Sequence, residues 1–353
     1  MPCPIPSADL DHVLEHSRSW WAPRRGARVL VTGATGFFGR WLLESFAHVN
    51  DRLSLGMQAG VLSRDLEAFA RRAPALAARR DLILLRGDVR HFAPPVGPWD
   101  LVLHAAATSS RAIDDLEMSE TVVNGTRHVL EWAHQAGVQR LLMVSSGAVY
   151  GRLEDTSGPI SEDHPSAADL TQQDGAYARS KRLAEQLTLQ VGANTNLEVS
   201  IARCFAFVGP HLPLDGHFAI GNFMAQALRD GDIHLAGDGS AVRTYMHAAD
   251  LALWLWGLLL QAPNLGIYNV GSSEPIRMAE LARLVLHLTG GDPRRVVLGN
   301  RPPSTEARPY YVPCVRRAQE LLGLRASLPL ADSIARTLTW ISQAERRQQG
   351  PLT

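Results

Sequence analysis

The stretch Gly33-Ala34-Thr35-Gly36-Phe37-Phe38-Gly39 decides the fold, because a buried strand is predicted before it and a helix after it. Residues 28–32 upstream form a short apolar run, and apolar residues recur at helical spacing over 41–46 downstream. At a strand-to-helix junction, Gly33 allows a tight turn, Gly36 leaves space for a phosphate and Gly39 lets the helix pack closely on the strand. We therefore expect a pyrophosphate at the helix N-terminus, although three glycines alone also fit a simple tight turn.

Further apolar runs alternate with helical patterns along the chain, which predicts an α/β fold with a Rossmann-type, doubly wound parallel sheet. A helix is expected at about 118–136, directly before the fifth strand. After the strand at 28–32, the expected strands are 59–62, 82–85, 101–103, 141–144 and 267–271. Ligands of such sheets bind beyond the carboxyl ends of the strands.

Two segments, 205–242 and 272–353, depart from this alternation and contain helices at about 278–288 and 330–344. We expect them to form a smaller, C-terminal substrate-binding lobe that closes a cleft over the sheet edge. The dinucleotide-binding Rossmann domain then comprises 27–204 plus 243–271, after an N-terminal extension of 1–26. In that extension, Trp20 and Trp21 are expected either to clamp the segment onto the domain or to cover a ligand as a lid.

The composition excludes several classes of protein. Lys plus Arg and Asp plus Glu number 35 each, and the basic pairs are scattered, so no nucleic-acid surface is expected. The most apolar stretch, 251–260, is far shorter than the roughly 20 residues that span a membrane, and it is typical of a buried helix. The N-terminus lacks the pattern of a signal peptide. Cys3, Cys204 and Cys314 have no metal-ligand or redox spacing, so a cytoplasmic protein without a metal site is favoured.

The residues after the second and third strands concern the adenosine part of a dinucleotide. An acid after the second strand would accept hydrogen bonds from the ribose, whereas Ser63 and Arg64 suit a 2′-phosphate. NADP is therefore favoured over NAD, although Arg64 also fits a solvated surface charge and Asp65 fits an acceptor turned toward the ribose. After the third strand, Asp88 and Val89 are expected beside the adenine.

The fourth strand leads to His104-Ala105-Ala106-Ala107, where small side chains leave room for a cofactor. We interpret His104 as a packed core histidine rather than a ligand, since no His, Cys or acid accompanies it at ligand spacing. The predicted cofactor-binding residues are Gly33, Thr35, Gly36, Phe37, Phe38, Gly39, Ser63, Arg64, Asp88, Val89, Ala105, Ala106, Ala107, Ser145, Tyr177, Lys181 and Phe205.

The strongest chemical signal is the pair Tyr177 and Lys181, which lie on one face of a predicted helix. A free tyrosine titrates near pH 10, and positive charge from Lys181 and an oxidised nicotinamide should lower the pKa of Tyr177. Ser146, at the end of the fifth strand, can bond the same substrate oxygen. The three residues fit proton removal from a secondary alcohol while hydride leaves its carbon, or the reverse, unless Tyr177 and Lys181 merely occupy a surface helix.

The order of these motifs resembles the extended short-chain dehydrogenase/reductases, most closely their nucleotide-sugar epimerase and dehydratase group. The likeness covers about residues 27–340 and extends to Glu185, which is similar to the acid that follows the lysine in this group. An arginine at the place of Arg243 binds the diphosphate in the group, as a planar guanidinium can. Arg308 is either a second such clamp or an isolated loop arginine. The substrate-binding residues expected from the resemblance and the motifs are Thr108, Ser146, Gly147, Asn222, Arg243 and Arg308.

Three departures from the group's pattern bear on the reaction. The 4,6-dehydratases have an Asp-Glu pair at the places of Gly147 and Ala148, and eliminating water needs such a proton donor, so dehydration is disfavoured. The group usually has Asn at Ala206, so a substrate hydrogen bond is missing or comes from elsewhere, such as Asn222. Finally, the second strand ends as in NADP-binding members rather than as in the NAD-binding 4-epimerases.

The resemblance implies an enzyme that oxidises or reduces C4 of a nucleoside-diphosphate hexose, with Tyr177 as acid/base, Lys181 tuning it and Ser146 positioning the oxygen. Epimerisation at C4 is the leading expectation, followed by NADPH-dependent reduction of a 4-keto-6-deoxy sugar and then by 4,6-dehydration. A non-catalytic, NAD(P)-sensing regulator is the alternative from another class, and it is disfavoured because Tyr177 and Lys181 are both present. Apolar positions on the helices at 118–136 and 177–192 favour a homodimer.

Overall fold

The computed structural model describes residues 3–106, 114–151, 158–167, 169, 175–216, 218–229, 231–300 and 309–349. Three of the predicted site residues, Ala107, Thr108 and Arg308, lie outside the described residues.

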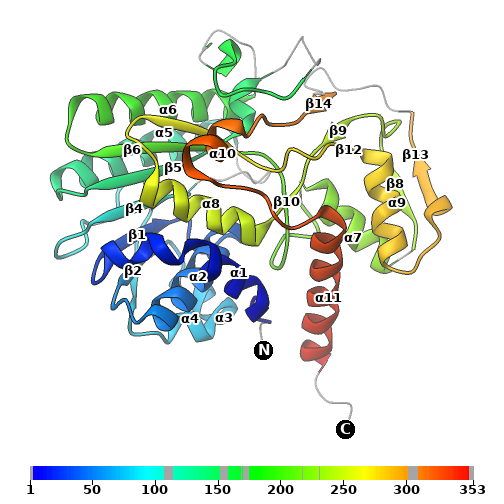
Figure 1. The fold of residues 1–353 in the computed structure, drawn as a ribbon, viewed down its shortest axis with the longest axis horizontal. Coiled ribbons are helices and arrows are strands. Elements are labelled where there is room, and N and C mark those ends of the chain that lie inside the picture. The colour runs from blue at the N-terminus through cyan, green and yellow to red at the C-terminus, as the bar shows by residue number, and fades with distance from the viewer. Residues whose placement is uncertain are drawn as a thin grey trace.

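A seven-stranded parallel sheet forms the centre of the larger part of the molecule (Figure 1). Its strand order is β11-β6-β5-β4-β1-β2-β3, so the direction of winding reverses between β1 and β4. The strands are β1 (Arg28–Thr32), β2 (Gln58–Ser63), β3 (Leu82–Arg86), β4 (Leu101–His104), β5 (Arg140–Ser146), β6 (Glu198–Cys204) and β11 (Gly266–Val270). The predicted Rossmann-type fold is confirmed, and its crevice lies at the carboxyl ends of β1 and β4.

Helices cover both faces of the sheet (Figure 1). On one face α5 and α6 pack side by side, and on the other α1 and α2 pack against α8, which is buried from Ala248 to Leu260. The bounds are α1 (Ser7–Trp21), α2 (Phe37–Leu53), α3 (Leu66–Arg72), α4 (Pro74–Ala77), α5 (Asp115–Gln135), α6 (Ala176–Asn194) and α8 (Ala248–Gln261). Within the described ranges, no helix is both long and apolar enough to cross a membrane.

The N-terminal helix α1 is part of the packed structure. Trp21 is fully buried, with its ring centre 5.0 Å from that of Trp256 on α8. At the other end of α1, the buried Asp9 accepts a hydrogen bond from Arg336 at 2.5 Å. The tryptophans therefore clamp the segment onto the domain, as one of the two expectations had it, and neither contributes to the pocket described below.

A separate apolar cluster joins α7 (Ala219–Arg229), α9 (Met278–Leu288) and α11 (Leu330–Gln349). In contrast, α10 (Arg316–Leu322) packs beside β11 and α8, although its residues belong to the segment assigned to the small lobe. Three short pairings complete the fold: β7 (Phe207–Val208) with β10 (Met246–His247), β8 (Ile233–Leu235) with β13 (Val296–Leu298), and β9 (Val242–Arg243) between β12 (Ile276–Arg277) and β14 (Tyr310–Tyr311).

Many apolar positions of α5 and α6 are used inside the chain. Val122, Val129 and Ala184 belong to the core between these helices and the sheet. Leu116 and Leu183 are 69% and 39% exposed. The apolar surface left for a second copy is therefore smaller than the sequence pattern indicated, and the homodimer stays a prediction.

Candidate active site

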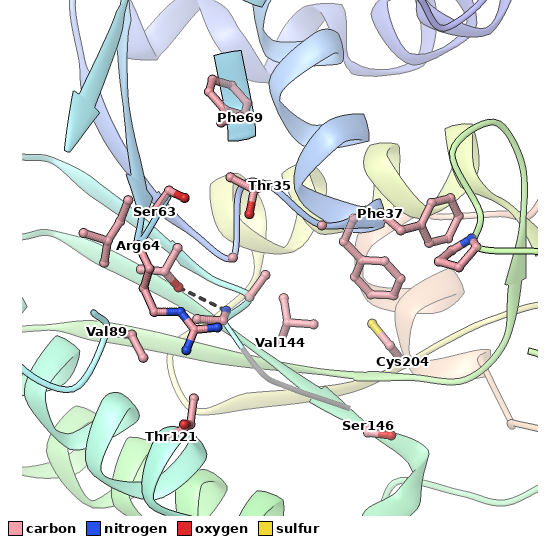
Figure 2. A pocket seen from close by; sticks show the side chains of 18 of the residues that line it. Thr35, Phe37, Ser63, Arg64, Phe69, Val89, Thr121, Val144, Ser146 and Cys204 are labelled. Carbon is pink, nitrogen blue, oxygen red and sulfur yellow. Dashed lines mark hydrogen bonds between the residues drawn. The ribbon is translucent and has the colours of Figure 1, made fainter. Parts of the chain in front are cut away.

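An elongated pocket of about 670 Å³ runs along the carboxyl ends of the sheet strands (Figure 2). Most of the predicted cofactor and catalytic residues meet in it, although they come from distant parts of the chain. The predicted residues that line it are Gly33, Thr35, Gly36, Phe37, Phe38, Ser63, Arg64, Asp88, Val89, Ala105, Ala106, Ser145, Ser146, Tyr177, Lys181 and Phe205.

The glycine turn fits the pyrophosphate of a dinucleotide. Gly33 has a φ of +70°, and a Cβ there would lie 2.5 Å from the Ala105 carbonyl oxygen, so a side chain is excluded. No side chain caps α2 at Gly36, which leaves the first N–H groups of this helix for an anion. Gly39 lies outside the pocket, where a Cβ would overlap the Ala34 backbone; this agrees with the packing role expected from the sequence.

At one end of the pocket lie Ser63, the last residue of β2, and Arg64, which follows it (Figure 2). The neighbouring Asp65 caps α3, and its carboxylate accepts a hydrogen bond from the Ala68 N–H at 2.7 Å. That bond lowers the pKa of Asp65 and draws its carboxylate toward the helix. Arg72, an unpredicted residue of the same helix, also lines the pocket, so two exposed guanidinium groups border this end.

Asp88 lines the pocket after β3, and its carboxylate is held by a side chain that the sequence analysis did not anticipate. Arg90 donates to both carboxylate oxygens, at 2.9 and 2.8 Å. This pairing lowers the pKa of Asp88 to about 2, so the group is ionised at neutral pH.

His104 is a core histidine, as predicted, and its hydrogen bonds assign its tautomer. Thr126 donates its hydroxyl proton to the Val122 carbonyl at 2.6 Å, so it accepts from His104 Nε2 at 3.0 Å. The other ring nitrogen, Nδ1, then accepts from the Thr32 hydroxyl at 2.8 Å. Burial lowers the pKa of His104 to about 3. The neutral ring joins β4 to β1 and α5, and Thr32 in turn accepts the Ala106 N–H that lines the pocket.

Tyr177, Lys181 and Ser146 gather at the other end of the pocket (Figure 2 shows Ser146 there, on the side of Phe37 and Cys204). The Lys181 ammonium lies 6.0 Å from the centre of the Tyr177 ring. It donates a hydrogen bond to the Val144 carbonyl at 2.8 Å. The Ser146 hydroxyl is a polar neighbour of the Tyr177 phenol and lowers its pKa.

The expected lowering of the tyrosine pKa is wrong for the protein's own groups. Burial raises the pKa of Tyr177 to about 12, outweighing the opposite effect of the Ser146 hydroxyl. Burial also lowers the pKa of Lys181 to about 8. Both shifts have one cause, the loss of water around a charged form, which a sequence pattern does not reveal. An oxidised nicotinamide, when bound, supplies the positive charge that acts in the opposite direction on the phenol.

Tyr311 is a residue that sequence reasoning missed. A Cβ at Gly147 would overlap its hydroxyl, and its ring lies 4.5 Å from that of Phe205. In the short sheet, Tyr311 pairs with Arg243, whose guanidinium lies 5.8 Å from the centre of the tyrosine ring. Tyr311 therefore links the predicted diphosphate arginine to the short 3-10 helix Gly147–Tyr150 that follows Ser146.

Three predicted substrate residues, Gly147, Asn222 and Arg243, are not among the described residues that line the pocket. Asn222 donates to the Gly216 carbonyl at 3.1 Å, and Arg243 donates to the carbonyl of Val242 at 2.7 Å. Besides Arg72, the lining residues that were not predicted are Thr32, Leu62, Ala68, Phe69, Gly87, Thr121, Val144, Cys204, Phe207, Leu212, Pro213 and Phe218. Gly87, Val144 and Cys204 lie at strand ends, a position that could have revealed them.

The geometry agrees with comparisons to known proteins. Residues 29–271 match the model of the NAD dependent epimerase/dehydratase family. The chain belongs to this family. It is an epimerase/dehydratase-family enzyme of the short-chain dehydrogenase/reductase type, so the resemblance inferred from its motifs is confirmed.

Relatives of this family enzyme catalyse several reactions. UDP-glucuronic acid decarboxylase 2 of Arabidopsis thaliana is 30% identical over 87% of this chain and 68% of that protein. DesIV, a dTDP-glucose 4,6-dehydratase of Streptomyces venezuelae solved with NAD and TYD, is 28% identical with a TM-score of 0.75, covering 92% of this chain and 100% of that one. MoeE5, solved with UDP-glucose and NAD, is 26% identical with a TM-score of 0.74, over 91% and 100%.

Proposed function

We propose that the enzyme transfers hydride at C4 of a nucleoside-diphosphate hexose. The observation that carries the proposal is that Tyr177, Lys181 and Ser146 line one pocket, which continues past the glycine turn to Ser63 and Arg64. A dinucleotide bound along this pocket supplies the hydride acceptor or donor.

In the oxidising direction, Tyr177 as the phenolate accepts the proton of the sugar hydroxyl while hydride leaves the carbon. Ser146 holds the same oxygen by a hydrogen bond, and the Lys181 ammonium favours the phenolate electrostatically. The reverse step returns a proton from Tyr177 to the oxygen. Because burial raises the pKa of Tyr177 to about 12, its base form depends on this nearby positive charge.

Epimerisation at C4 is the outcome that the site supports best. Gly147 and Ala148 offer no acid for the elimination of water, and any side chain at 147 would overlap the Tyr311 hydroxyl. A 4-keto sugar that takes the hydride back on its other face needs no further acid or base. The 4,6-dehydratase outcome is therefore the weaker alternative, even though a dehydratase is among the structural neighbours.

Decarboxylation is the second candidate, because a UDP-glucuronic acid decarboxylase is 30% identical to this chain. Oxidation of a uronic acid at C4 yields a β-keto acid, which loses carbon dioxide without an acid at 147 or 148. Its carboxylate needs a cation, however. Apart from Arg64 and Arg72, the cation among the described lining residues is Lys181, which already donates to Val144, and Phe207, Leu212 and Pro213 of the same lining are apolar. This lining favours an uncharged hexose.

For the cofactor we propose NADP, because Arg64 and Arg72 border the end of the pocket that follows β2 while Asp65 caps α3. The solved relatives DesIV and MoeE5 contain NAD, which makes this the point of the proposal most open to test. A preference for NADP would also suit an enzyme that uses NADPH to reduce a 4-keto-6-deoxy sugar.

A panel of substrates tests the proposal. UDP-glucose, UDP-glucuronic acid and a 4-keto-6-deoxy nucleotide sugar are each incubated with the enzyme and either dinucleotide, and the products are followed by NMR. Inversion at C4 without net loss of cofactor supports epimerisation, whereas a UDP-linked pentose together with carbon dioxide indicates decarboxylation. Stoichiometric loss of NADPH indicates a reductase. Hydride transfer that is unchanged in a Tyr177→Phe variant contradicts the proposal and restores the non-catalytic alternative for this residue pair.

Three further expectations stay predictions: the division into a cofactor domain and a substrate lobe, the homodimer and the cytoplasmic location. So do substrate contacts by Thr108, Gly147, Asn222, Arg243 and Arg308. For Asn222 and Arg243, the side chains would have to turn from Gly216 and Val242, their present hydrogen-bond acceptors, to reach a sugar nucleotide.

A further inference from the structure

We propose that Glu185 is a positioning residue, which fixes how helix α6 sits on the end of strand β5 and thereby holds Tyr177 and Lys181 against Ser146. The inference rests on the function proposed for those three residues, and it adds a residue that touches neither substrate nor cofactor.

Glu185 belongs to a stripe along α6. Tyr177, Lys181 and Glu185 follow one another at intervals of four residues, so their side chains leave the helix on one face. That face meets the carboxyl end of β5, which carries Ser146.

Each member of the stripe meets a different residue at the end of β5. Lys181 donates to the carbonyl of Val144, and Tyr177 lies beside the hydroxyl of Ser146, which lowers the pKa of the phenol. Between them, the Ser145 hydroxyl donates to Glu185 at 2.5 Å. A slip of the helix along the strand would therefore break the Glu185 bond together with the bond of Lys181, and it would move Tyr177 away from Ser146.

Glu185 is anchored more firmly than the other two members. It is buried, and Arg203 on β6 donates to its carboxylate through Nε at 3.1 Å and through a terminal nitrogen at 2.8 Å. Arg203 is the register partner of Ser145 on the neighbouring strand. It also donates to the Tyr150 hydroxyl at 3.1 Å and to the Glu162 carbonyl at 2.8 Å.

The carboxylate thus joins the catalytic helix to two adjacent sheet strands. A buried ion pair by itself says little about stability, because desolvation offsets the attraction. What gives this pair a role in positioning is its third partner, Ser145, which directly precedes Ser146 in the chain. Reacting groups displaced by about 1 Å can lose roughly 100-fold in rate, so a device that sets the helix on the strand acts on turnover.

The test separates an effect on positioning from an effect on folding, because each variant removes a different interaction of Glu185. Ser145→Ala leaves the pair of Glu185 with Arg203 intact and removes the link to β5, whereas Glu185→Gln keeps the shape and removes the charge. Ser145→Thr retains the hydroxyl and is the conservative rescue. Ser180→Ala is the matched control, because Ser180 is buried on the same helix and donates only to its own helix, at the Ala176 carbonyl.

We expect Ser145→Ala to lower kcat about 10-fold with little change in the KM for the dinucleotide. The pH at which oxidation reaches half its plateau should rise by about 0.5 unit, because the phenolate is held less closely to the ammonium. Glu185→Gln should show the same changes, larger in size, together with a lower unfolding midpoint. Ser145→Thr should recover most of the kcat that Ser145→Ala loses, and Ser180→Ala should keep the wild-type kcat and pH profile.

Measuring Tyr177→Phe in parallel distinguishes failure of this inference from failure of the proposed function. If Tyr177→Phe is inactive while Ser145→Ala and Glu185→Gln retain the wild-type kcat and pH profile, Glu185 has a structural role alone and the inference is overturned. If Tyr177→Phe turns over as fast as the wild type, the proposed function fails first.

Discussion

The two ends of the pocket are built in different ways. After β2, Arg64 and Arg72 are exposed side chains on a loop and a short helix. At the other end, Lys181 is 3% exposed. The ion pair of Glu185 with Arg203 joins its helix, α6, to strand β6. We infer that exposed residues set how tightly a cofactor binds, whereas the buried network sets how fast chemistry proceeds.

The largest effect is expected at the buried end, from Tyr177→Phe. Loss of the acid/base hydroxyl should lower kcat by about 1000-fold, within the range for general acid–base catalysis. Cofactor binding, followed by fluorescence titration, should change little because the ring is kept. A variant that lost cofactor affinity in proportion to kcat would contradict the separation of the two ends.

The next effect concerns the contact of Gly147 with Tyr311. Gly147→Ala should lower the free energy of unfolding by about 1–3 kcal/mol, because its methyl group overlaps the Tyr311 hydroxyl. In a Tyr311→Phe background the same change should cost less, since the overlapping oxygen is gone. Urea unfolding of the two single variants and the double variant forms a double-mutant cycle. Strict additivity would show that the two positions do not compete for space.

Acid should destabilise the buried end through His104. Its pKa is lowered to about 3 in the folded protein, so it stays neutral there while the unfolded chain takes up a proton below about pH 6.5. The free energy of unfolding therefore keeps its full value with respect to His104 above about pH 6.5. It declines by at most about 1.4 kcal/mol per pH unit as the pH falls toward 3. Urea unfolding at several pH values should show a shallower decline for His104→Gln. The exposed His91→Gln is the control and should leave the slope unchanged.

The smallest effect is expected at the exposed end, from Arg64→Ala. Removing this guanidinium should reduce the preference for NADP over NAD about tenfold, through one charge-assisted hydrogen bond. The unfolding midpoint should not change, because the side chain is exposed. Arg71→Ala removes a neighbouring exposed arginine that does not line the pocket, and it should leave the preference unaltered. Equal affinities of the wild type for both cofactors would remove the case for NADP.

Local patterns made the fold and much of the site predictable. The turn at Gly33, the strand ends and the spacing of Tyr177 and Lys181 are properties of short stretches, and parallel strands bring such ends together. Tyr311 was not predictable in the same way. It reaches Gly147 from a two-residue strand near the end of the chain, which carries no periodicity.

The hydrogen-bond partners of individual side chains and their burial could not be predicted from the sequence either. Asp88 could be placed after β3, but nothing in its neighbourhood showed that Arg90 would hold its carboxylate. The pKa of Tyr177 depends on how much water surrounds the phenol, which follows from packing and not from spacing. The same limit applies to the tryptophans of α1. Their sequence fitted both a clamp and a lid, and only the packing of Trp21 on Trp256 of α8 distinguishes the two.

The docking of α1 on α8 bears on how the molecule is assembled during synthesis. During synthesis, α1 is made more than 200 residues before its partner α8, and Asp9 is made still longer before its partner Arg336. At about 5–20 residues per second, the apolar face of α1 stays uncovered for roughly ten seconds or more. The nascent chain therefore passes through a stage that chaperones can bind, and a fragment ending before residue 248 should be prone to aggregate.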